Sequence, residues 1–181
     1  MLSDRAGISQ PIRRYTKTAR ALHWLMAIAI VTLLLLGQRT MSNHDLRVLP
    51  TLHASAGLAI IFMLAFRLFW RWKHPPPEPL ATTRWQGMAA RATHALLYVA
   101  MLLIPLTGWF AYTEHVHRSL GVRPASWFGF RIPLLPDFGI NWHFIHNWGG
   151  KLALLLIALH VAAALKHHFY DRDDTLKRML P

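Results

Sequence analysis

Apolar residues gather in four long runs that polar or proline-rich stretches separate. The runs cover approximately residues 21–38, 53–72, 88–112 and 145–170. Each is long enough for a helix that crosses a bilayer, which needs about 20 residues. Only helices and closed barrels satisfy their own backbone hydrogen bonds in lipid. The pattern therefore predicts an all-α fold, a bundle of four transmembrane helices in a single integral membrane domain over residues 1–181.

The connections between the runs differ in character. The second contains the stiff stretch from Pro75 to Pro79, which ends a helix. The third, from Thr113 to His143, has a length that is usually functional or interfacial. The first run ends at Gln38 and Arg39 without a small-x-small cleavage pattern, so we expect an uncleaved anchor rather than a signal peptide.

Basic residues predict the orientation in the membrane. Of 20 Lys and Arg, 14 lie in the N-terminal tail, the second connection with its flanks, and the C-terminal end. The positive-inside rule puts that side in the cytoplasm, with both termini. The net charge of +12 does not indicate nucleic-acid binding, because the basic residues cluster outside the apolar runs and no nucleic-acid motif is present. The other side carries Arg39, Arg47, Arg118, Arg123 and Arg131, with Lys151 just inside the fourth run.

The amino-acid composition excludes several kinds of cofactor and cross-link. The chain has no Cys, which excludes disulfides, iron–sulfur clusters, thiolate haem ligation and covalent c-type attachment. Only 15 % of the residues are charged, against about 25 % in a typical soluble domain. Twelve His are an excess that calls for a function.

Several of the His fall at matched depths in the membrane. His146 and His160 are fourteen residues apart on the fourth helix, which is about 21 Å of rise and about 40° around the axis, so they share a face. His53 lies near the outer end of the second helix. His23 and His94 lie near the inner ends of the first and third helices. The order in which the four spans cross the membrane therefore predicts an outer pair, His53 with His146, and an inner pair, His160 with either His23 or His94.

Such pairs suit two b haems stacked across the membrane. Two axial imidazoles make a closed, six-coordinate iron that passes electrons rather than binding a gas. Ionisable groups within a membrane are costly and usually functional. Small residues follow His53 and His160, and they would admit either a macrocycle or close helix–helix contact.

Other polar residues are secondary candidates. Arg67 follows His53 by fourteen residues and would reach a propionate of the inner haem, unless it only snorkels to the inner interface. His167 lies two turns beyond His160 and would either bond a quinone head group or form a polar helix end. His115 and His117 would suit a metal ion on the outer side, although no carboxylate partners them.

Short motifs along the four runs resemble the bacterial cytochrome b561 family. The resemblance implies a four-helix, dihaem b-type cytochrome of the bacterial inner membrane, embedded in lipid, in which His23 pairs with His160 and His53 with His146. It leaves His94 as a polar contact near the inner haem, to a propionate or quinone. The motifs are Arg14–Thr16, Arg20–Trp24, Leu52–Gly57, Arg67–Arg71 and Leu159–His168.

The resemblance also suggests an activity. The family is linked to the quinone pool, and superoxide oxidation is attributed to it. We therefore expect an oxidoreductase that couples oxidation of a periplasmic donor, superoxide above all, to reduction of ubiquinone. The outer segments carry a balance of +3, and the steering candidates Arg118, Arg123 and Lys151 would speed the arrival of a small anion.

Two other functions compete with this one. The same haems would also serve an electron-relay or membrane-anchor subunit of a dehydrogenase, a hydrogenase or a periplasmic redox partner. A His-rich metal transporter is a poorer match, because the predicted spans contain no Asp or Glu.

Overall fold

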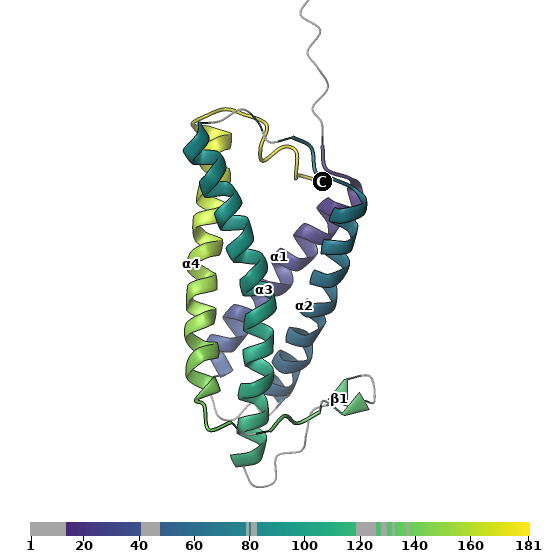
Figure 1. Cartoon of the computed structure of the whole chain (residues 1–181), viewed down its shortest axis with the longest axis vertical. Helices are drawn as coiled ribbons and strands as arrows, with labels where there is room; N and C mark the ends of the chain where they lie inside the picture. Colours follow the sequence, from purple (N-terminus) through teal and green to yellow (C-terminus); the bar gives the residue numbers. More distant parts are fainter. Residues whose placement is uncertain are drawn as a thin grey trace, which may run out of the picture.

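Four long helices form the molecule. The computed structural model describes residues 14–40, 48–78, 80, 83–118, 126–127, 130–131, 133–136 and 138–181. The helices are α1 (Lys17–Thr40), α2 (Val48–Lys73), α3 (Arg84–Arg118) and α4 (Trp142–Phe169), which run along the long axis of the bundle (Figure 1). All four are long and apolar enough to cross a membrane, which confirms the predicted helical bundle.

Polar caps set the start of α3 and of α4, and α3 extends beyond its apolar run at both ends. The backbone N–H of Thr83 donates to Oε1 of Gln86 at 3.1 Å, half of a capping box, so α3 begins at Arg84 instead of near residue 88. At its other end α3 continues to Arg118 instead of stopping near residue 112. In α4, Oδ1 of Asn141 accepts from the N–H of Phe144 at 2.9 Å, so that helix starts at Trp142.

The third connection contains the one element of the described chain that is not helical. Two strands of two residues each, β1 (Ser126–Trp127) and β2 (Phe130–Arg131), pair antiparallel. The sequence did not predict this ribbon, since a strand of two residues is too short to show alternation.

The helices pack in a row rather than as an evenly closed bundle. Within the described residues, α2 packs against both α1 and α3, and α3 packs along α4. Contacts between α1 and α4 are few, and α2 and α4 do not pack against each other. Any side chains that meet across α1 and α4, or across α2 and α4, therefore reach over the middle of the bundle.

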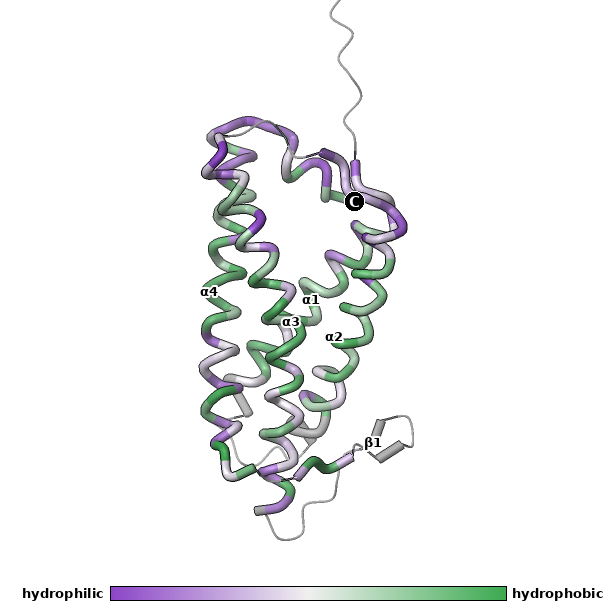
Figure 2. Tube along the Cα trace, viewed as in Figure 1, coloured by the Kyte–Doolittle hydropathy of each residue, from purple (hydrophilic) through white to green (hydrophobic). Residues whose placement is uncertain are grey.

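Apolar side chains cover the outside of the bundle. Few residues are buried, among them Met26, Ile60 and Leu64, while large ones such as Phe62 and Trp72 are more than half exposed. Such exposure is not tolerated in water but matches lipid. Hydrophobic residues fill the middle of each helix and hydrophilic residues gather at the end that holds the C-terminus (Figure 2). The protein is therefore a multi-pass membrane protein.

The C-terminal segment folds back across the same end of the bundle at which α1 begins (Figure 1). The N–H of Tyr15 donates to the carbonyl of Arg178 at 3.3 Å, and the Trp24 indole N–H donates to the carbonyl of Met179 at 2.9 Å. The Arg178 guanidinium donates to the carbonyl of Glu78 at 2.7 Å. These bonds bring the start of α1, the connection after α2 and the C-terminus together.

Candidate functional site

The outer histidine pair joins α2 to α4. The ring centroids of His53 and His146 lie 5.9 Å apart, and the ring planes are nearly perpendicular at 84°. Both side chains are partly buried. Because α2 and α4 do not pack against each other, this contact spans the middle of the bundle near its outer end.

The backbone of α3 fixes the orientation of His146. Nδ1 of His146 lies 3.0 Å from the carbonyl oxygen of Ile104, so this nitrogen carries the proton and donates. Nε2 is then left with its lone pair, which is the form in which imidazole binds a metal. The hydroxyl of Thr107 donates to the same carbonyl at 2.9 Å.

Two glycines leave room for the rings of the outer pair. A Cβ atom on Gly108 would lie 2.7 Å from Cε1 of His146, which is closer than real contacts allow. A Cβ on Gly37 would lie 3.1 Å from Cε1 of His53. Nδ1 of His53 is buried and has no hydrogen-bond partner. A buried ring nitrogen of this kind is normally satisfied by a ligand, an ion or water.

The inner group contains three histidines. The His23 and His160 centroids lie 6.2 Å apart with planes at 77°, and the His94 and His160 centroids lie 5.4 Å apart at 66°. His160 thus sits between a ring from α1 and a ring from α3. The structure brings together every histidine that the sequence placed at the inner depth.

Arg67 of α2 reaches into this inner group. Its Nη2 lies 3.4 Å from Nδ1 of His23, and its Nη1 donates to the carbonyl of Ala19 at 3.4 Å. A guanidinium only donates, so it makes Nδ1 of His23 the acceptor and leaves the proton on Nε2. Metal binding through Nε2 therefore requires that Arg67 move from His23 to another acceptor.

The pair distances fit two imidazoles on one metal. A metal–nitrogen bond is about 2.0 Å long. The atoms of an imidazole ring lie about 1.2 Å from its centre, given ring bonds of about 1.35 Å. Two imidazoles on opposite sides of one metal would therefore have centroids about 6.4 Å apart. The values of 6.2 and 5.9 Å come within about half an ångström of this separation. The His94–His160 distance falls about one ångström short of it. At each depth the two histidines would therefore fit a haem iron held between them.

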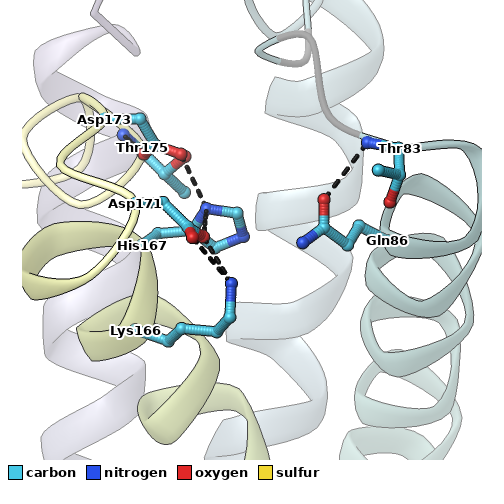
Figure 3. A network of polar contacts seen from close by, with 7 residues as sticks. All are labelled: Thr83, Gln86, Lys166, His167, Asp171, Asp173 and Thr175. Atoms are coloured by element: carbon cyan, nitrogen blue, oxygen red, sulfur yellow. Dashed lines mark hydrogen bonds and ion pairs between the residues drawn. The ribbon is translucent and has the colours of Figure 1, made fainter.

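His167 takes part in a polar cluster at the inner end of α4. Its Nδ1 lies 2.6 Å from Oδ2 of Asp173 and 3.2 Å from Oδ2 of Asp171, which also pairs with Lys166 (Figure 3). The Thr175 N–H donates to Asp173 at 2.8 Å. The cluster fixes the turn that sends the C-terminal segment back, so Nδ1 of His167 is already bonded within the protein.

The steering candidates are only partly placed. Lys151 is exposed, with its Nζ 4.4 Å from the centre of the Trp148 ring. Arg118 ends α3, but its side chain lies outside the described residues, as does all of Arg123.

Glu114 corrects the expectation that the spans hold no acidic residue. Because α3 extends to Arg118, Glu114 falls on a membrane-capable helix, and it is only 5 % exposed. Its Oε2 accepts from the N–H of Trp142, the first residue of α4, at 3.2 Å. Glu114 therefore ties α3 to α4.

Sequence reasoning also missed the residues that position His146. The carbonyl of Ile104 and the bare backbone of Gly108 leave no polar signal in a sequence. Their only trace is the stretch Pro105-Leu106-Thr107-Gly108 inside an apolar run. It indicates a helix that is irregular or whose backbone another group can approach closely.

Known proteins resemble this chain over nearly all its length. A family model described as prokaryotic cytochrome b561 matches residues 14–181. Cytochrome b561 homolog 2 of Escherichia coli (strain K12) is 37 % identical over 177 residues, which cover 92 % of this chain and 91 % of that protein. Cytochrome b561 homolog 1 of the same organism is 30 % identical over 183 residues, or 94 % and 98 %. A probable superoxide oxidase CybB of Yersinia pestis is 24 % identical over 182 residues, or 93 % and 97 %.

Proposed function

Because the chain belongs to the prokaryotic cytochrome b561 family, we propose that it binds one b haem at each histidine pair and couples the oxidation of superoxide at the outer end to the reduction of ubiquinone. Transmembrane electron transfer by a b-type membrane cytochrome is what the family provides. We propose two haems with these ligands, superoxide as the donor and ubiquinone as the acceptor. We also propose that the chain is a single domain in the bacterial inner membrane.

The observation that carries the proposal is the pairing of His53 with His146 and of His23 with His160, each at a bis-imidazole distance. Haem iron supplies a one-electron carrier when two imidazoles hold it. The two pairs meet α4 at points about 21 Å apart, by the rise of fourteen helical residues. Redox groups at both levels suit a protein that moves electrons across a bilayer.

His23 is the proposed partner of His160, and His94 has a supporting role. The His23–His160 separation of 6.2 Å would suit two imidazoles on one iron better than the 5.4 Å between His94 and His160. His94 is left to bond a propionate or a quinone at this level. His167 is the weaker quinone candidate, because its Nδ1 is held by Asp173.

The chain's own residues hold the charges that a haem brings. Arg67 is partly buried beside His23 and offers a guanidinium to a propionate of the inner haem. In taking that propionate it would leave Nδ1 of His23. The bond between His146 and the carbonyl of Ile104 keeps the outer ligand in the tautomer that binds iron.

Two observations support superoxide as the donor. A relative that is 24 % identical bears the name of a probable superoxide oxidase. The outer segments also carry a positive balance, which speeds the arrival of a small anion.

The test is a coupled assay on the purified protein with enzymatically generated superoxide and a soluble ubiquinone. The proposal predicts quinol formation that superoxide dismutase abolishes, and its loss in His146→Leu. A protein that is fully loaded with haem but forms no quinol, or that forms it only with a co-purifying dehydrogenase, would instead serve as an electron relay for that partner.

A further inference from the structure

A third pair of imidazoles bridges two helices at the outer end of the bundle. The ring centroids of His115 on α3 and His143 on α4 lie 6.2 Å apart, with planes at 80°. These values nearly repeat those of the His23–His160 pair, at 6.2 Å and 77°. Unlike the membrane pairs, both side chains are exposed. Both residues also lie beyond the apolar runs 88–112 and 145–170, so an ion from solution reaches them.

The surrounding contacts hold the two helix ends in register. Glu114, next to His115, accepts from the N–H of Trp142, next to His143, at 3.2 Å. The Trp142 ring stacks on Phe110 of α3 with centroids 4.4 Å apart and planes at 20°. One hydrogen bond and one ring stack therefore join the residues that flank the pair, so little ordering is needed to bring the two imidazoles together.

The third histidine of this region lies on another face of α3. His117 follows His115 by two residues, about 200° around a helix, and such residues do not face each other. The His115–His117 pair that the sequence suggested is therefore not the one that the fold assembles. His115 meets His143, which lies more than twenty residues away along the chain.

The distance between the two ring centroids can be compared with the distances expected for different metal ions. Two imidazoles in trans positions on a metal have centroids about 6.4 Å apart, whereas a tetrahedral angle brings them to about 5.2 Å. The observed 6.2 Å is nearer to the first of these separations. Trans nitrogen ligands suit the square-planar or tetragonal geometry of Cu²⁺ and not tetrahedral Zn²⁺, and Cu²⁺ also binds nitrogen ligands most strongly of the common divalent metals.

We propose that His115 and His143 bind one Cu²⁺ ion at the outer end of α3 and α4, with water in the remaining positions. The carboxylate of Glu114, one residue away, favours a cation there through charge alone. The site does not depend on haem or on the proposed electron transfer. His143 precedes His146 by one helical turn, so the ion lies next to the outer haem level.

The test is a Cu²⁺ titration of the purified, haem-loaded protein in detergent, with bound copper measured after gel filtration and with electron paramagnetic resonance of the cupric signal. The protein is expected to bind one copper at this site and to show hyperfine coupling to two nitrogen nuclei. His115→Gln and His143→Gln are each expected to weaken binding at least about tenfold. Zn²⁺ is expected to compete poorly.

Two variants serve as matched controls. His117→Gln removes an exposed imidazole from the same helix end, and His167→Gln disables the cluster with Asp171 and Asp173 at the other end of the molecule. Neither is expected to change the cupric signal. An unaltered haem spectrum in each variant shows that the variant has folded. The coupling of the cupric signal to two nitrogen nuclei is measured on the unmodified protein, so this part of the test does not depend on the folding of any variant.

Three results would overturn the site. They are the absence of saturable copper binding, an unchanged affinity in the His115→Gln, His143→Gln double variant, or an equal loss in His117→Gln. None of them bears on the haem pairs, and failure of quinone reduction would leave the copper site unaffected.

Discussion

The missing side chain at Gly108 decides where the His146 ring lies. A methyl group there would meet Cε1 of that ring at 2.7 Å, with Nδ1 at 3.0 Å. The ring can therefore approach the α3 backbone closely enough to donate to the carbonyl of Ile104. The proposed outer ligand is thus positioned by a glycine and a backbone oxygen, neither of which carries charge.

Replacement of Gly108 by Ala should displace the outer ligand. We expect the outer haem to be lost or weakly held, so that total haem falls by about half, while the inner haem is retained. Haem quantification and the reduced-minus-oxidised spectrum measure this. Gly87→Ala is the control, because a Cβ there meets only the flexible end of Arg91 at 3.7 Å. Equal haem contents in the two variants would contradict the role of Gly108.

Arg67 should matter to the inner haem alone. Its guanidinium lies 3.4 Å from His23 and far from the outer pair along α2. We expect Arg67→Leu to loosen the inner haem, through loss of a cation for a propionate, and to spare the outer one. Arg91→Leu, an exposed arginine of α3, is the control. Spectra that show equal retention of both haems in Arg67→Leu would remove the propionate assignment.

Among the helices, α4 supplies one histidine to each pair, and α1 and α2 supply one partner each. Hydropathy alone located these helices, and helical periodicity placed His146 and His160 on one face. Depth along the helices left His23 and His94 open as partners of His160, and the family resemblance favoured His23; the structure brings both rings to the inner level. Depth is a property of one helix, whereas ligand choice depends on how helices pack.

Substitution of His23 and substitution of His94 should affect the inner haem differently. His23→Leu should abolish the inner haem, whereas His94→Leu should keep it and shift its spectrum or potential modestly, because His94 is a neighbour and not an axial ligand. The measurement is haem content per chain with redox titration of both variants. Retention in His23→Leu together with loss in His94→Leu would reverse the assignment.

The C-terminal turn depends on Asp173. Burial raises the pKa of this carboxyl, but hydrogen bonds from Thr175 and His167 outweigh that effect and hold the pKa below its usual 3.8. Since the folded pKa is the lower one, the stabilisation is fully present above pH 3.8 and fades as pH falls through the folded value.

Loss of this carboxylate should free the segment from residue 170 to residue 181. We expect faster amide hydrogen exchange there in Asp173→Asn at neutral pH, because the bond to His167 weakens. Asp174→Asn is the matched control, since Asp174 pairs with Lys177 on the surface. Equal exchange rates in the two variants would show that the cluster does not hold the turn.

At the scale of the molecule, the sequence predicted the membrane bundle and the clustering of histidines, but not the outer surface. The polar residues at the end of α3 looked like loop, so the length of that helix, the burial of Glu114 and the meeting of His115 with His143 all came from packing. An apolar run locates the part of a helix that lies in lipid, and polar caps decide how far the helix continues beyond it.

Charge on the outer surface should govern the approach of superoxide. We expect the rate of reduction by superoxide to fall as ionic strength rises, with a weaker salt dependence in a variant that carries Arg118→Gln, Arg123→Gln and Lys151→Gln. Stopped-flow spectroscopy of the haem bands measures both. The same salt dependence in the variant and the unmodified protein would argue against steering by these residues.

In the proposed function, each of two cross-helix histidine pairs holds one haem. Quantification of haem per chain, together with reduced-minus-oxidised spectra, in the unmodified protein and in His146→Leu and His160→Leu tests it most directly. Two haems are expected in the unmodified protein, and each variant is expected to lose a different spectral component with about half the haem. A colourless protein, or one that keeps both components after His160→Leu, would contradict it.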